Sequence, residues 1–240
     1  IGVAAVVSVS IATSTTRLAY KEMFAAVTGR AALEVTGAGD TTVDESLVRL
    51  VQDTQGVRAA VPIVQRRTVL YSGPNGKVGV IVLGIDVEKD RKYVHDYELA
   101  AGRFLDEDGG MMLEASFARK LELELGDDVR FLPKNAERRG RVQAEASLVG
   151  LLKPSGVSAM RLGNLMFLPI GRAQRLFAGP GRVDAIQVVL DETADRRAVE
   201  KDLAERLPVG CTVRRPLGRT ETVDETLMAS EQALRLTTAF

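Results

Sequence analysis

Very few side chains in this sequence could carry out chemistry. His95 is the only histidine and Cys211 is the only cysteine. A single cysteine excludes an intrachain disulfide and a thiolate metal cluster, and a single histidine means that most His-dependent nucleophilic mechanisms would have to use His95. His95 lies between Tyr93 and Tyr97 without a recognisable motif, which favours a surface or half-buried histidine over a functional one. Cys211 is interpreted as a small buried apolar residue beside a short strand.

The glycine-rich and acidic motifs do not match known sites. The run GPNGK at 73–77 lacks the spacing of a phosphate-binding loop, and no Ser or Thr follows its lysine. The acidic run at 106–108 could bind a hard cation, but its spacing is not that of a calcium loop, so a solvated acidic turn is the simpler interpretation. We therefore expect no catalytic residue, no cofactor site and no metal site.

The composition is that of a globular protein without excess charge. Of the 240 residues, 45% are hydrophobic and 27% are charged, which excludes disorder as the main state. Lys+Arg and Asp+Glu both number 32, so the basic surplus expected of a nucleic-acid binder is missing. We therefore expect no nucleic-acid partner.

Residues 1–29 have the composition of a membrane helix and its extension. No charged residue precedes Arg17, and residues 1–12 are dense in Ile, Val, Ala and Gly. A complete span needs about 20 apolar residues, so this segment is interpreted as the end of a first transmembrane helix. Arg17 and Lys21 are then expected at the head-group boundary. A secretory h-region and a buried helix of a soluble protein are the alternatives.

Residues 217–240 show a matching pattern. From Thr220 onward there is no Gly or Pro, apolar residues recur at helical spacing, and the last charge is Arg235. We expect a helix that leads into a second transmembrane helix. The chain is thus predicted to be an insert on the extracytoplasmic (periplasmic) side of the inner or cell membrane.

Turn signals and apolar periodicity between these ends predict an α+β fold in two parts. Segments 30–96 and 180–216 mix strands and helices and are expected to share one sheet, with 97–179 as an inserted, mainly-β lobe. Thr42 and Glu45 form a capping-box pattern ahead of a predicted helix that ends at Gly56. The other predicted strands lie at 31–36, 57–64, 67–71, 77–85, 110–113, 129–132, 143–152, 164–170, 183–190 and 211–214, and the other helices at 115–121, 171–178 and 193–207.

Four runs of residues resemble the MacB-like periplasmic core domain of FtsX-like ABC transporter permeases. They are AGRFLDED at 101–108, GMMLEASFARKL at 110–121, LGDDV at 125–129 and FLPIGRAQRL at 167–176. The resemblance implies a porter-like α/β lobe with an inserted mainly-β lobe, flanked by juxtamembrane helices. It also implies a membrane protein without enzymatic activity in this segment. A separate cytoplasmic ATPase would drive a dimer of permeases, and this domain would transmit the motion to substrate export, lipoprotein release or a periplasmic partner.

The family has no common set of functional side chains, so the resemblance assigns no site residues. A partner surface has to be proposed from the residues of this sequence. The best candidate is the loop at 153–163, where Met160 and Leu162 are apolar residues among turn formers such as Ser155. An ordinary loop without a partner is the alternative. The competing function is a ligand-sensing domain of a membrane receptor, which needs a pocket with convergent polar groups. A membrane-anchored hydrolase would need a nucleophile and a base in one cleft.

Overall fold

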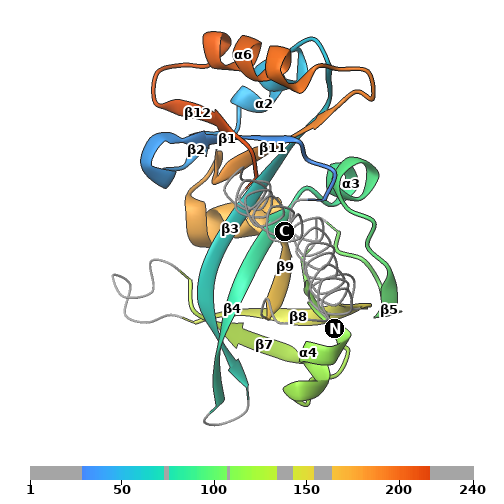
Figure 1. Ribbon diagram of the computed structural model, residues 1–240. Helices are drawn as coiled ribbons and strands as arrows, with labels where there is room; N and C mark the ends of the chain where they lie inside the picture. Colours follow the sequence, from blue (N-terminus) through green and yellow to red (C-terminus); the bar gives the residue numbers. More distant parts are fainter. Residues whose placement is uncertain (1–28, 73–75, 107–108, 134–142, 154–163, 217–240) are drawn as a thin grey trace, which may run out of the picture.

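The computed structural model describes residues 29–72, 76–106, 109–133, 143–153 and 164–216 (Figure 1). Their main feature is a ten-stranded mixed sheet in the order β12-β1-β11-β3-β4-β9-β6-β8-β5, with β7 pairing with β3 and β8, while β2 and β10 form a separate short ladder. The strands are β1 (Leu33–Gly37), β2 (Val43–Asp44), β3 (Val57–Ser72), β4 (Gly76–Ile85), β5 (Leu99–Gly102), β6 (Met111–Glu114), β7 (Asp128–Phe131), β8 (Ala144–Leu152), β9 (Leu165–Pro169), β10 (Arg182–Val183), β11 (Ala185–Leu190) and β12 (Cys211–Arg214). The helical segments are η1 (Ala38–Asp40), α2 (Leu47–Gln52), α3 (Val87–Lys89), η2 (Asp90–Val94), α4 (Ala115–Lys120), α5 (Ile170–Ala173), η3 (Gln174–Ala178) and α6 (Arg196–Arg206). The predicted α+β class is confirmed.

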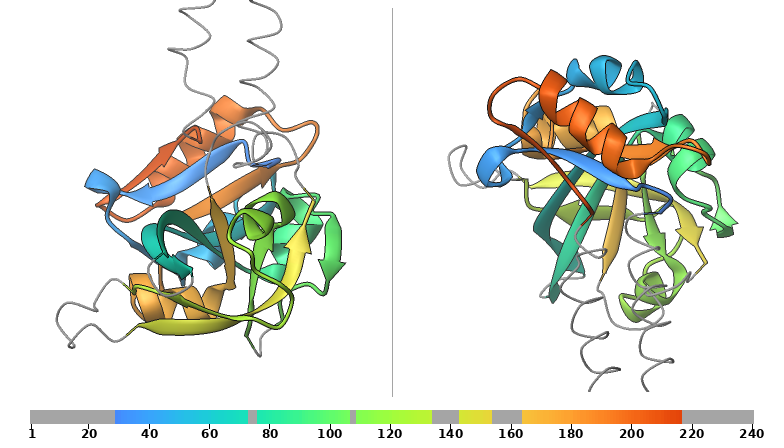
Figure 2. Two further views of the ribbon diagram at one scale, coloured as in Figure 1. Left: turned by 90° about the horizontal axis from the view of Figure 1, so that it is seen from below. Right: turned by 45° about the horizontal axis from the view of Figure 1, so that its top comes forward.

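One end of the sheet is covered by α2 and α6 (Figures 1 and 2). Val199 and Leu203 of α6 and Val51 of α2 are buried in the same core as Val35 and Ile186 of the strands. Since successive side chains of a strand point to opposite faces, the even-numbered residues of β1 lie on the face away from these helices.

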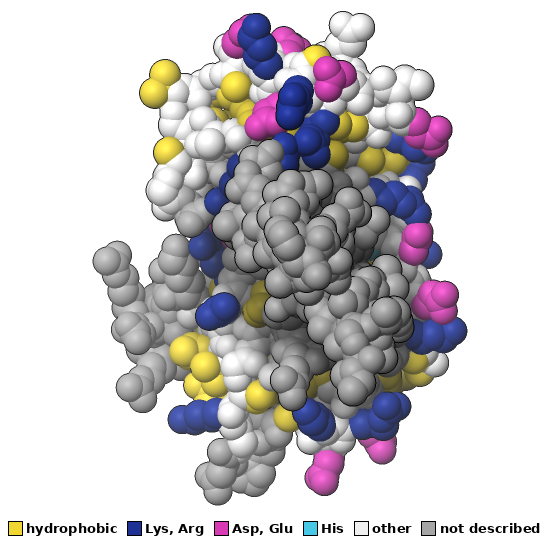
Figure 3. Space-filling model, viewed as in Figure 1, with side chains coloured by type: hydrophobic (Ala, Val, Ile, Leu, Met, Phe, Trp, Pro, Cys, Tyr) yellow, Lys and Arg dark blue, Asp and Glu magenta, His cyan; other side chains and the backbone are white. Residues whose placement is uncertain are grey.

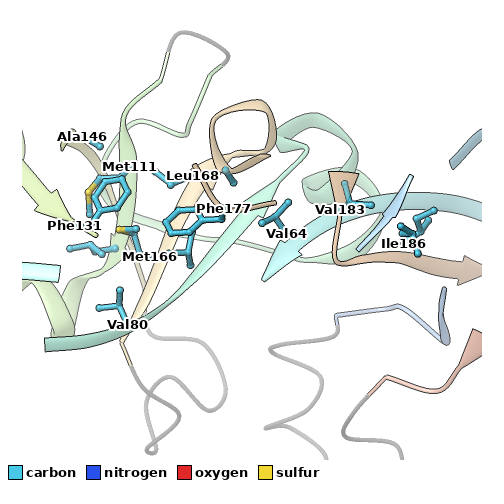
Figure 4. Close-up of a cluster of buried hydrophobic side chains, with 14 of the residues drawn as sticks. Val64, Val80, Met111, Phe131, Ala146, Met166, Leu168, Phe177, Val183 and Ile186 are labelled. Atoms are coloured by element: carbon cyan, nitrogen blue, oxygen red, sulfur yellow. The ribbon is translucent and has the colours of Figure 1, made fainter. Parts of the chain in front are cut away.

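The other end of the sheet closes on itself. β3, β4, β9, β6, β8 and β7 each pair with the next, and β7 returns to β3 through Leu70 opposite Phe131 and Tyr71 opposite Arg130. Alternate side chains of such a ring point inward and fill it. The rings of Phe131 and Phe177 stack there with their centroids 6.2 Å apart, within the apolar cluster of Figure 4.

The ring and the helix-covered end share strands. β3 pairs with β11 on one side and with β4 and β7 on the other, so the sheet continues across the predicted division at residue 97. The division into 30–96 with 180–216 and 97–179 stays a prediction. The predicted juxtamembrane segments 1–29 and 217–240 lie outside the described residues, apart from Gly29.

Two local predictions were wrong. The strands expected at 57–64 and 67–71 are one strand, β3, because its register with β4 runs without a break from Ile63 to Ser72. The capping box does not form at Thr42, because Val43 pairs with Val183 of β10 and the helix starts later, at Leu47.

Candidate functional site: the joint where the chain enters and leaves the sheet

The chain enters and leaves the described fold through two neighbouring strands. The incoming segment (residues 29–32) leads into β1, and β12 ends close to the last described residue, Pro216. β1 and β12 are antiparallel, with Glu34 opposite Arg214. The start of β1 and the end of β12 therefore lie at the same end of one ladder.

A row of polar side chains crosses this joint. Glu34 is opposite Arg214 on one side and opposite the buried Gln187 of β11 on the other. The Glu34 side chain is 13% exposed, and its Oε2 lies 3.7 Å from Arg214 Nε. Burial raises the pKa of Glu34, and the positive charge of Arg214 offsets part of this rise. The joint thus holds a partly desolvated carboxylate on the sheet face away from α2 and α6.

The incoming segment also contacts η2, which follows α3 (Figure 1). The Arg30 N–H donates to the Val94 carbonyl oxygen at 2.9 Å. The Arg30 guanidinium forms an ion pair with Asp96, and the two side chains are 52% and 79% exposed. Gly29 has a φ of +54°, and a Cβ at this position would collide with the Val94 carbonyl oxygen. The backbone approaches η2 this closely because residue 29 is a glycine.

The two attachments of the incoming segment differ in strength. An exposed ion pair contributes about 0–1 kcal/mol and one hydrogen bond about 0.5–1.5 kcal/mol. In contrast, β1 pairs with both β11 and β12 and buries Leu33 and Val35 completely. Each such side chain contributes about 1.5–3 kcal/mol. The contact with η2 is the weaker of the two.

η2 itself is anchored by a buried polar pair. Asp90 and His95 are 1% and 6% exposed, and His95 Nδ1 lies 3.0 Å from Asp90 Oδ1. The His95 ring stacks on Tyr97 at 5.0 Å, and Tyr97 meets Phe167 of β9 edge-on at 5.4 Å. Burial, together with the nearby Asp90 carboxylate, raises the pKa of Tyr97 well above 10. This polar and aromatic row joins η2 to the centre of the sheet.

Two of the residues first considered for chemistry are placed differently from the expectation. His95 is buried and not on the surface or half-buried, because a π-helical turn brings residues five apart together: the His95 N–H donates to the Asp90 carbonyl oxygen at 3.0 Å. The signal in the sequence is an Asp and a His five residues apart. A search for polar pairs three or four residues apart, the spacing of an α-helix, misses it. Cys211 is half-buried, and burial raises its pKa.

The proposed partner residues Ser155, Met160 and Leu162 lie outside the described residues. The structure does describe both bases of their loop. Lys153 forms an ion pair with Glu98 at 2.8 Å, and Asn164 Nδ2 donates to the Gly79 carbonyl oxygen at 2.9 Å. The structure therefore fixes where this loop begins and ends, beside β5 and β4.

Among the described residues, no group of three or more His, Cys, Asp and Glu side chains could hold a metal ion. Asp106 of the acidic run pairs with Arg103, and the rest of that run is not described. On the face of the molecule seen in Figure 3, Lys and Arg side chains are interspersed with Asp and Glu over the described residues. This agrees with the zero net charge. No helix within the described ranges is long and apolar enough to cross a membrane.

Solved structures share this fold. The periplasmic region of MacB from Actinobacillus actinomycetemcomitans superposes with a TM-score of 0.56 at 14% identity, over 84% of this chain and 94% of that one. The extracellular domain of the noncanonic ABC-type transporter YknZ from Gram-positive bacteria gives a TM-score of 0.54 at 13% identity, over 77% of this chain and 99% of that one. At these identities the similarity concerns the fold alone.

Sequence comparison identifies the family. An uncharacterized ABC transporter permease protein of Mycobacterium tuberculosis (strain ATCC 25618 / H37Rv) is 33% identical over 110 residues, which are 45% of this chain and 12% of that protein. The chain thus spans a small part of the length of this relative. The MacB-like periplasmic core domain matches residues 1–206 of the chain. The chain therefore belongs to the family of the MacB-like periplasmic core domain.

Proposed function

We propose that this chain is the extracytoplasmic part of an ABC transporter permease and transmits movement across the membrane. A separate cytoplasmic ATPase would supply the movement, and two juxtamembrane helices would carry it to this domain. The domain would pass it on to substrate export, lipoprotein release or a periplasmic partner. A dimer of permeases is the proposed assembly.

One relationship supports this proposal above the others. The incoming segment leads into β1, and β1 forms one ladder with the outgoing strand β12, in which Glu34 lies opposite Arg214. Two helices that leave a domain from one ladder can move it as a body, because both apply their displacement to the same rigid element.

The test is a distance measurement across the two juxtamembrane segments. Spin labels are placed at Lys21→Cys and Glu221→Cys in the full-length permease, with Cys211 and every other cysteine replaced, reconstituted with its ATPase in nanodiscs. We expect the distance distribution with ATP and vanadate to differ from that without nucleotide, because ATP binding must shift a conformational population. An identical distribution in both states would contradict the proposal.

We further propose the loop at 153–163 as the surface that meets a periplasmic protein or lipoprotein. Photocrosslinkers at Ser155, Met160 and Leu162 in membranes should capture an extracytoplasmic protein. A crosslinker at the exposed Lys201 of α6 is the matched control. Capture from Lys201 but not from the loop would show that the loop is not the surface that meets the partner.

A further inference from the structure

The contact between the incoming segment and η2 has the features of a releasable element. It includes one backbone hydrogen bond, from the Arg30 N–H to the Val94 carbonyl oxygen, and one exposed ion pair, between Arg30 and Asp96 just after η2. Both contacts are polar, and an exposed ion pair adds little to a single hydrogen bond.

The elements on either side of this contact are much more firmly held. On one side, β1 is paired along both edges and its apolar side chains belong to the main core. On the other side, Val94 of η2 is buried against Ala59, Val61 and Val189, and Asp90 with His95 forms a buried pair. A displacement of the incoming segment would therefore separate it from η2 before it disrupted either neighbour.

Gly29 gives the contact a defined closed position. Its positive φ and the absence of a Cβ let the backbone lie against the Val94 carbonyl group. The closed contact thus depends on backbone shape as well as on charge, which distinguishes it from a chance surface ion pair.

We propose that Arg30, Val94 and Asp96 form a latch that is closed in the nucleotide-free permease and open in the ATP-bound permease. The latch rests on the proposed function, because only a driven incoming segment would have cause to leave η2. When it opens, the incoming segment moves away from η2, while the β12-β1 ladder and η2 both stay with the sheet, η2 through the packing of Val94 against β3 and β11.

The test compares two crosslinking pairs in the full-length permease with its ATPase, in nanodiscs, with Cys211 and every other cysteine replaced. The latch pair is Arg30→Cys with Asp96→Cys, which removes the ion pair but keeps the Arg30–Val94 backbone hydrogen bond and the Gly29 contact, so its rate reports the proximity of the two segments. The ladder pair is Thr36→Cys with Thr212→Cys, which are register partners on β1 and β12. A short bismaleimide is added without nucleotide and with ATP and vanadate. We expect the rate of the latch pair to change by at least about threefold between the two states, and the rate of the ladder pair to stay constant.

The spin-label pair at Lys21 and Glu221 separates the possible failures. If that distance responds to nucleotide while the latch pair crosslinks at one rate, the latch is wrong and the proposed function stands. If neither responds, the proposed function fails and the latch with it. A further variant, Arg30→Glu, should shift the nucleotide-free distance distribution toward that of the ATP state, and Arg30→Glu with Asp96→Arg should restore it. A nucleotide-free distribution that Arg30→Glu leaves unchanged would also overturn the latch.

Discussion

Glu34 of β1 and Arg214 of β12 lie opposite each other at the point where the chain enters and leaves the sheet, with Arg214 Nε 3.7 Å from Glu34 Oε2. The two residues are far apart in sequence, and their pairing brings both connections of the domain to one place. The Glu34 carboxylate is mostly buried there, so its ionisation couples the joint to pH.

The stability contribution of Glu34 should depend on pH in a defined direction. Burial raises the pKa of Glu34 above its ordinary value of 4.5, so the folded state holds the proton more tightly than the unfolded state does. The resulting stabilisation is present below pH 4.5 and is lost as the pH rises through the raised pKa. Glu34→Gln cannot titrate. Relative to the parent protein, its free energy of unfolding should therefore rise from pH 4 upward and level off above the raised pKa.

Urea unfolding of the purified chain at several pH values between 4 and 8 measures this difference. Glu200→Gln in α6 is the control, because this residue lies outside the ladder that pairs Glu34 with Arg214. A difference between Glu34→Gln and the parent that stays constant over this range would contradict the account of the joint.

Packing between β4 and α5 should tolerate no added methyl group. A Cβ at Gly84 would collide with the Cβ of Ala173 and lie 3.1 Å from the Cβ of Val64. Gly84→Ala should lower the free energy of unfolding by about 1–3 kcal/mol, because the buried core is already filled. The matched control is Gly79→Ala in the same strand, where nothing lies within 4 Å of the added atom. Equal effects of the two substitutions would show that the close approach is not tight.

The buried pair that anchors η2 should be far more important for stability than the exposed pair beside it. His95→Ala leaves the Asp90 carboxylate buried without this partner, which should cost about 3 kcal/mol or more. Asp96→Ala removes only the exposed ion pair with Arg30 and should cost about 1 kcal/mol or less. Thermal or urea unfolding of both variants provides the comparison, and a loss for His95→Ala as small as that for Asp96→Ala would mean that η2 is held by apolar contacts alone.

The sequence predicts the strands with clear alternation or β-branched centres, and it predicts α6 from its apolar periodicity. It does not predict η2, because a π-helical turn lacks the 3.6-residue period. It also misses β5, whose Leu-Ala-Ala-Gly sequence has no β-branched residue. The expected break between 57–64 and 67–71, at Gln65 and Arg66, does not occur, because pairing with β4 keeps the strand continuous.

The candidate site was predicted only in outline. The composition of the two ends indicated that the connections of the domain matter, and the described ends of the fold do meet at one ladder. The contacts themselves join residues distant in sequence, such as Arg30 with Asp96 and Glu34 with Arg214. No local pattern records such pairs, because they are set by strand order and register.

Force transmission requires the domain to lie on the opposite side of the membrane from the ATPase, and a labelling experiment tests this requirement most directly. The full-length permease, with Cys211 and every other cysteine replaced, receives a single cysteine at Lys201, a side chain that is 80% exposed on α6. A membrane-impermeant maleimide is then added to spheroplasts or protoplasts and to inverted membrane vesicles. We predict rapid labelling of the spheroplasts or protoplasts, and labelling of the inverted vesicles only after detergent is added. Labelling of the inverted vesicles without detergent, with no labelling of the spheroplasts or protoplasts, would place the domain in the cytoplasm and contradict the proposed function.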